Sequence, residues 1–68
     1  MSSVEEVLAR AEELLGQLNE RRAELERLAE EGDVDGDAAV ELITEIAELA
    51  RRIEVELTRA RTIADAAG

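Results

Sequence analysis

The sequence predicts an all-α fold, an antiparallel helical hairpin of two long helices, which we expect to dimerise into a four-helix bundle. Ala, Glu, Leu and Arg dominate the 68 residues, and such a composition is typical of long helices and coiled coils. Apolar residues recur at steps of three and four along two stretches, which is the period of a helix. A short acidic segment with two glycines separates these stretches and indicates a turn.

The first predicted helix covers residues 3–31. Its apolar side chains fall on heptad positions a, d and e, and this stripe is wider than the a/d seam of a simple coiled coil. Arg21 interrupts the stripe at a d position. The stripe consists of Val4, Ala11, Leu18 and Leu25 at a, Val7, Leu14 and Leu28 at d, and Leu8, Leu15 and Ala29 at e.

The predicted turn covers residues 32–36. Gly32 can adopt the left-handed conformation that closes a helix. Asp35 or Asp37 can accept hydrogen bonds from the free N–H groups of the next helix, where negative charge is also favourable. Because the connection is short, we expect the two helices to be antiparallel neighbours.

The second predicted helix covers residues 37–65 and repeats the a/d/e scheme. Glu56 interrupts it at a d position. The stripe consists of Ala39, Ile46, Ile53 and Ala60 at a, Leu42, Leu49 and Ile63 at d, and Ile43, Ala50, Leu57 and Ala64 at e.

The width of the stripes predicts a partner, because one hairpin leaves part of each stripe exposed and two hairpins cover it. A single core in so short a chain is rarely sufficient, and the sequence has neither Cys for a disulfide nor His for a zinc site. We therefore expect residues 1–68 to form one domain that associates with a second copy or with a larger helical protein. The predicted interface residues are Val4, Val7, Leu8, Ala11, Leu14, Leu15, Leu18, Arg21, Leu25, Leu28, Leu42, Ile43, Ile46, Leu49, Ile53, Glu56, Leu57, Ala60 and Ile63.

The two charged residues in the stripe have two interpretations. In one hairpin, Arg21 is expected level with Ala47, and Glu56 with Glu12, so that Arg21 and Glu56 do not meet. A two-fold axis through the middle of the long axis brings Arg21 of one chain close to Glu56 of the other, and this pair would select an antiparallel dimer. Alternatively, both side chains reach solvent at the edge of the stripe.

Besides the cap-and-turn interpretation, a calcium site is a second, less favoured interpretation of the acidic turn. Asp33, Asp35 and Asp37 occupy the alternate positions from which a calcium-binding loop takes its first ligands. Such a loop needs glycine at its sixth position and a bidentate acid at its twelfth, and here these residues are Ala38 and Thr44. The cap-and-turn interpretation accounts for the same residues more completely.

The residue types present do not favour catalysis. His, Cys, Lys and Tyr are absent, and the few Ser and Thr hydroxyls have no base to activate them. The Glu-x-x-His motif of di-metal bundles cannot occur. We therefore predict no catalytic residue, no cofactor and no metal site other than the calcium alternative.

The charge of the chain limits its partners. The net charge is −10, so direct binding to nucleic acid or to anionic lipid would have to overcome repulsion. No apolar run approaches the roughly 20 residues of a membrane span. The start, MSSVEEVL, lacks the basic and apolar regions of a signal peptide, and we expect a cytoplasmic location.

Residues 30–61, EEGDVDGDAAVELITEIAELARRIEVELTRAR, resemble the small subunit of exodeoxyribonuclease VII. Members of that family are short, acidic helical hairpins. The matching elements are Glu31-Gly32 at the end of the first helix, and Leu49-Ala50-Arg51-Arg52, Leu57 and Ala60-Arg61 in the second. The resemblance implies a non-catalytic subunit that docks on the helical region of a large nuclease subunit. It carries over no catalytic residue.

Overall fold

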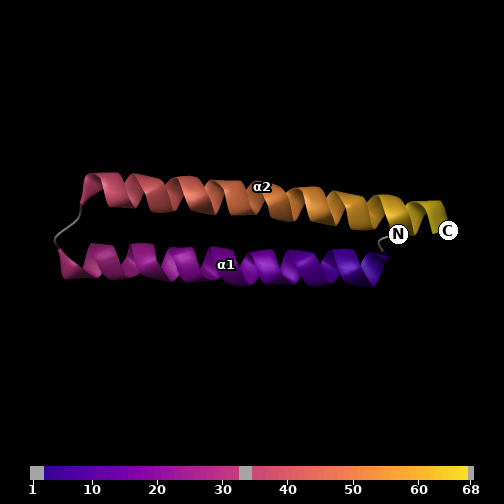
Figure 1. Cartoon of the computed structure of the whole chain (residues 1–68), viewed down its shortest axis with the longest axis horizontal. Helices are drawn as coiled ribbons and strands as arrows, with labels where there is room; N and C mark the ends of the chain where they lie inside the picture. Colours follow the sequence, from indigo (N-terminus) through magenta and orange to yellow (C-terminus); the bar gives the residue numbers. More distant parts are fainter. Residues whose placement is uncertain (1–2, 33–34, 68) are drawn as a thin grey trace.

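The chain folds into two long helices that lie side by side (Figure 1). The structure, a computed structural model, describes residues 3–32 and 35–67. Helix α1 spans Val4–Glu31 and helix α2 spans Gly36–Ala67. The helices run antiparallel, so the beginning of α1 and the end of α2 lie together at one end of a rod measuring 52 × 16 × 14 Å. We call this the open end and the opposite end the loop end. The predicted antiparallel hairpin is confirmed.

The helix ends are set by local hydrogen bonds. The sequence predicted that the first helix begins at Ser3, but in the structure Ser3 is the N-cap of α1. Its Oγ accepts a hydrogen bond from the Glu6 N–H at 3.1 Å. Gly32 closes α1 with a φ of 71°, a left-handed conformation that costs glycine little. At the start of α2, the Asp35 carboxylate accepts a hydrogen bond from the Asp37 N–H at 3.0 Å. Of the two predicted caps, Asp35 is therefore the one that acts.

The second helix is slightly longer than predicted. It begins at Gly36 rather than at residue 37 and ends at Ala67 rather than at residue 65. The Ala39 N–H donates to the Asp35 carbonyl at 3.0 Å, which completes the first turn. Because alanine has the highest helix propensity, the final Ala66-Ala67 pair extends the helix readily.

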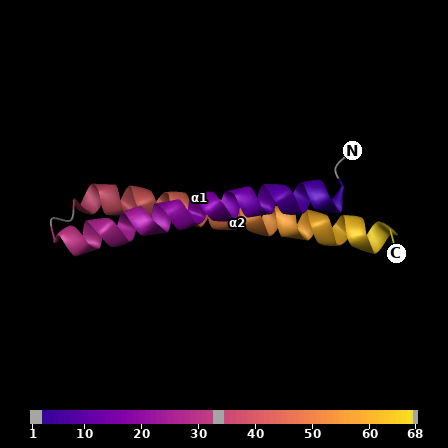
Figure 2. The ribbon, with the colours of Figure 1, turned by 90° about the horizontal axis from the view of Figure 1, so that it is seen from below.

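The core is the narrow seam where the a and d positions of α1 and α2 face each other. The helices cross at a shallow angle, as they do when a and d side chains interdigitate along a hairpin (Figure 2). Within the described residues, the buried apolar side chains are Val7, Ala11, Leu42, Leu49 and Ala60, and Val7 is the one that is fully buried. The remaining predicted interface residues at a and d are half-buried: Val4, Leu14, Leu18, Arg21, Leu25, Leu28, Ile46, Ile53, Glu56 and Ile63.

The e positions remain exposed. Leu8, Leu15, Ile43 and Leu57 belong to the predicted interface, yet the hairpin does not bury them. The a/d/e stripe therefore divides into a seam used within the chain and an outer strip that nothing within the described residues covers.

Candidate interaction surface

The two sides of the hairpin differ in chemistry. The helices run in opposite directions with a and d facing inward, so equal heptad positions of α1 and α2 lie on the same side of the pair. The g positions line one side. Two grooves on this side are lined by g residues of both helices, Glu24 and Gln17 from α1 and Glu45 from α2. We call it the charged side. Its g residues are Arg10, Gln17, Glu24, Glu31, Ala38, Glu45, Arg52 and Arg59.

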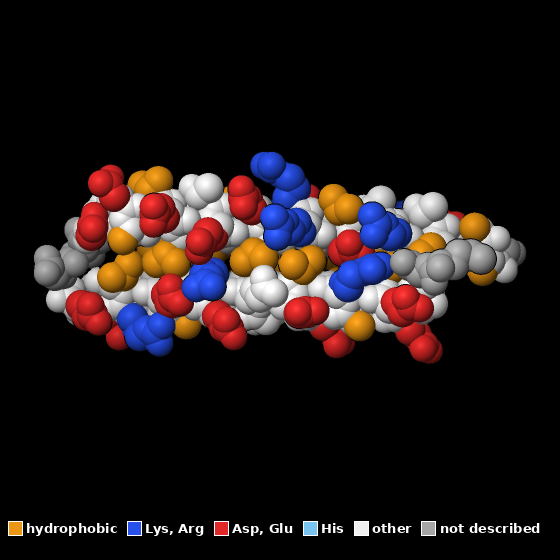
Figure 3. All heavy atoms as spheres, viewed as in Figure 1, with side chains coloured by type: hydrophobic (Ala, Val, Ile, Leu, Met, Phe, Trp, Pro, Cys, Tyr) orange, Lys and Arg blue, Asp and Glu red, His pale blue; other side chains and the backbone are white. Residues whose placement is uncertain are grey.

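Figure 3 shows charged side chains along both edges of the seam, with a thin apolar strip between them. Acidic groups predominate toward the loop end, and the basic groups cluster toward the middle and the open end. This face therefore offers a mainly polar surface whose charge changes from acidic near the loop end to mixed near the open end.

Ion pairs across this side join the two helices. Arg21 Nε lies 3.5 Å from Glu45 Oε2, while Arg21 Nη1 donates to Glu24 Oε1 at 2.9 Å. Toward the open end, Arg10 Nε lies 3.5 Å from Glu56 Oε2. The Arg21–Glu45 pair is exposed enough for solvent to screen it, so it contributes modestly to stability, whereas the Glu56 side chain of the other pair is largely buried.

Glu56 has the least exposed charged side chain among these pairs, 14% against 45% for Arg10. Arg59 Nη1 donates to its Oε1 at 3.3 Å. Its Oε2 is buried and accepts no hydrogen bond from the described residues, although Arg10 is near. The carboxylate is thus drawn into a d position of the seam and held there by two arginines at its edge.

These contacts bear on the two sequence interpretations of Arg21 and Glu56. The two side chains do not meet within the chain, as expected, and each finds a partner of opposite charge in its own hairpin. Glu56 does not extend into solvent. Each partner lies two residues from the expected level, Glu45 rather than Ala47 and Arg10 rather than Glu12, and the shift has the same direction in both pairs. The pair between chains remains a hypothesis.

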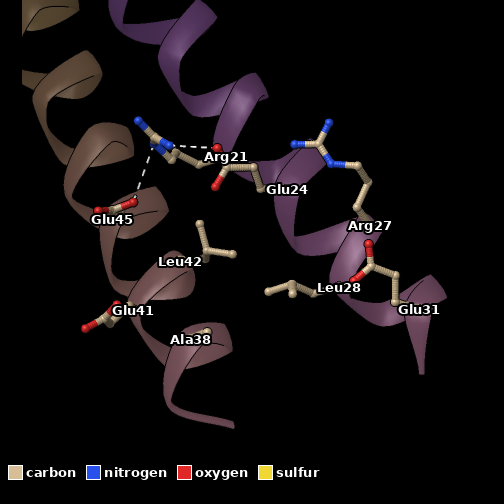
Figure 4. A pocket seen from close by; sticks show the side chains of 9 residues that line it. All are labelled: Arg21, Glu24, Arg27, Leu28, Glu31, Ala38, Glu41, Leu42 and Glu45. Carbon is tan, nitrogen blue, oxygen red and sulfur yellow. Dashed lines mark hydrogen bonds and ion pairs between the residues drawn. The ribbon is translucent and has the colours of Figure 1, made fainter. Parts of the chain in front are cut away.

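One groove of the charged side lies near the loop end and has a volume of about 490 Å³. In Figure 4, Leu28 and Leu42 point toward each other between the helices, and Arg21 extends from α1 toward Glu45 on α2. The rim is mainly acidic, with Glu24, Glu31, Glu41 and Glu45. Among residues 3–32 and 35–67, no group of three or more acidic residues is placed to hold a metal ion.

The predicted calcium ligands are only partly described. Asp33 lies outside the described residues. Asp35 uses its carboxylate to cap α2, and Asp37 is exposed in the first turn of that helix. The cap interpretation is therefore confirmed for Asp35, and calcium binding stays a prediction.

The opposite side of the hairpin carries most of the large apolar side chains that remain exposed, among charged residues such as Glu12 and Arg22. It carries the e positions and the neighbouring b positions of both helices, and we call it the apolar side. In the described part of the chain, six large apolar side chains are exposed, and five of them lie here, the exception being Val55 at a c position. The five are Leu8, Leu15, Val40, Ile43 and Leu57.

Helix α2 supplies most of this surface. Between its large residues lie Ala47 and Ala50, which are also exposed and leave the helix backbone accessible. Val40 was absent from the sequence prediction, although it is the most exposed of the five at 62%. Its position three residues before Ile43 places both on the same face of a helix, and this spacing could have revealed it.

Searches of protein-family models, of curated proteins and of solved structures found no match to this chain. Along the described residues, neither helix has a stretch apolar enough to cross a membrane.

Proposed function

We propose that this chain is a non-enzymatic assembly module, in which two hairpins associate through their apolar sides into a four-helix bundle. The observation that carries the proposal is the placement of five of the six exposed large apolar side chains on one side of the hairpin. Large apolar side chains that are exposed together on one side of a molecule are typical of a protein–protein interface. A second copy offers the same surface, as the interface of a symmetric dimer requires.

The small core supports the same proposal. Only five apolar side chains are buried within the described residues, and two of these are alanines. A core of this size provides little stability for a chain of 68 residues. Covering the apolar side would bury five further large side chains, each of which contributes roughly 1.5–3 kcal/mol when fully removed from water.

Sedimentation equilibrium of the purified chain tests this proposal, with a matched pair of variants. Ile43→Glu places a charge on the apolar side, whereas Val55→Glu places the same charge at an equally exposed site off that side, since the two residues are 54% and 51% exposed. We expect the wild type and Val55→Glu to sediment as dimers, and Ile43→Glu to weaken association by at least about a hundredfold. A monomeric wild type, or equal effects of the two variants, would contradict the proposal.

The resemblance of residues 30–61 to the exodeoxyribonuclease VII small subunit supports an alternative. In that case the apolar side would dock on a larger helical protein, and the chain would be an accessory subunit without its own catalytic residues. Such a subunit should be poorly ordered alone and gain helical structure with its large partner. A self-sufficient dimer should instead melt alone in one sharp transition, which circular dichroism would record.

A further inference from the structure

We infer that the second copy binds antiparallel, with its loop end beside the open end of the first, about a two-fold axis that passes close to Ala50. This inference rests on the proposed self-association and specifies its geometry. Two hairpins that cover each other's apolar sides can be arranged in two ways, with their loop ends together or at opposite ends. Two features of the chain, the charge pairing on α1 and the distribution of net charge, favour opposite ends, and the symmetry of the α2 surface is compatible with them.

The apolar side of α2 is self-complementary about Ala50. Ile43 lies seven residues before Ala50 and Leu57 lies seven residues after it, so all three share the e position. A two-fold axis at Ala50 therefore sets Ile43 of each copy at the level of Leu57 of the other copy. Ala47 and Ala50 lie near the axis, where small side chains let the two α2 helices approach closely. This reciprocal matching is the property that a two-fold interface requires.

The same axis pairs opposite charges on α1. The ion pairs of Arg21 with Glu45 and of Arg10 with Glu56 place Ala50 approximately level with Gln17. Arg22 lies five residues after Gln17 and Glu12 lies five residues before it, and both are exposed at e and b positions of the apolar side. The axis thus sets Arg22 of each copy level with Glu12 of the other. With loop ends together, Arg22 would instead lie over the apolar Ile43 of the second copy.

The distribution of net charge points the same way. Residues 17–50, the half toward the loop end, carry eleven acidic and three arginine residues, a net charge of −8. Residues 1–16 and 51–68, the half toward the open end, carry seven acidic and five arginine residues, a net charge of −2. With loop ends together, the two strongly acidic halves would be adjacent. The antiparallel arrangement sets each of them beside a nearly neutral half and reduces the repulsion.

Single cysteines distinguish the two arrangements, since the chain has no Cys of its own. Ala50→Cys lies near the proposed two-fold axis. There the Cα atoms of the two cysteines come within the roughly 7 Å that a disulfide requires. Ala29→Cys is the matched control: it also occupies an exposed e position of the apolar side, but it lies twelve residues from the level of Gln17. In the antiparallel dimer, the two cysteines at position 29 are about 36 Å apart along the long axis of the hairpins.

Under mild oxidation we expect at least about tenfold more disulfide-linked dimer from Ala50→Cys than from Ala29→Cys. Spin labels at position 29 should give a distance of roughly 35–40 Å by pulsed electron paramagnetic resonance. If the chain is dimeric but position 29 gives a distance below about 20 Å and Ala50→Cys fails to link, the orientation is wrong and self-association stands. If the chain sediments as a monomer, the proposed function itself fails, and this inference fails with it.

Discussion

At the scale of single residues, Glu56 and Arg21 show how a charged side chain is accommodated in an apolar stripe. Both occupy d positions, and both lean toward the charged side, where residues of the opposite helix pair with them. Glu56 is the more buried, and one of its carboxylate oxygens accepts no hydrogen bond from the described residues. A carboxylate in such a place gives up favourable hydration for ion pairs that solvent partly screens.

We therefore predict that Glu56→Leu stabilises the hairpin, by about 1–2 kcal/mol, because an apolar side chain fills the d position without the cost of dehydrating a charge. Arg10 and Arg59 lose their contacts with Glu56 at little cost, since their side chains are 45% and 49% exposed. Thermal denaturation followed by circular dichroism measures the change. Glu13→Leu, at an exposed position, removes the same charge and should leave the melting temperature nearly unchanged. A lower melting temperature for Glu56→Leu would show that the carboxylate is a stabilising element.

At the scale of the helices, Ser3 and Gly32 cap the two ends of α1, Asp35 caps the start of α2, and the interior of α1 consists mainly of residues with high helix propensity. Gly16 in the middle of α1 is the exception. A methyl group added there would meet no atom within 4 Å, and the residue has ordinary helical geometry. Gly32 also has open space around it, but its positive φ disfavours any side chain.

Gly16→Ala should accordingly stabilise the hairpin by about 1 kcal/mol, because alanine loses less backbone entropy on helix formation. Gly32→Ala, the same chemical change, should destabilise it by a similar amount, because the left-handed conformation strains a residue with a Cβ. Urea unfolding of both variants gives the two signs in one experiment. Equal signs would mean that one of the two backbone environments differs from that described.

At the scale of the whole molecule, the division into a charged and an apolar side is the feature that decides how the hairpin meets other molecules. The charged side carries ion pairs between the two helices, and the apolar side is not covered by any described residue. The net charge of −10 nevertheless opposes every association between two copies.

The proposed dimer should therefore become tighter as salt is added, because screening weakens the repulsion between the copies while hydrophobic contacts persist. We expect the dissociation constant to fall several-fold between roughly 0.02 and 0.5 M NaCl, measured by sedimentation equilibrium. In the double variant Glu41→Gln/Glu48→Gln, which removes two exposed charges of the loop-end half away from the apolar side, the salt dependence should be smaller. A dimer that weakens with salt would be held by ion pairs between chains rather than by apolar contacts.

Much of the fold follows directly from the sequence. The steps of three and four predicted both helices, and Gly32 with Asp35 predicted the turn, because these signals depend on local backbone chemistry. The partners of Arg21 and Glu56 were less predictable, since they depend on the exact register of the two helices, which differs by two residues from the expected one. The capping role of Ser3 was missed, although Glu6 three residues later is a recognisable signal.

The gathering of exposed apolar residues on one side of the hairpin could not be predicted from the periodicity of either helix alone. The heptad positions placed Leu8, Leu15, Ile43 and Leu57 at e, but only the antiparallel arrangement brings the e positions of both helices to the same side. Val40 joins this side through its spacing from Ile43. The candidate surface is thus a property of the pair of helices and not of either stripe.

The common location of the two helix ends has a consequence for anything attached to this chain. A polypeptide joined before α1 or after α2 leaves the hairpin at the open end, and the loop end projects about 52 Å away from it. In an antiparallel dimer the two open ends point in opposite directions. Two polypeptides attached in this way would then be held apart by a stiff spacer of roughly the length of one hairpin. A fusion to either terminus would leave the apolar side free.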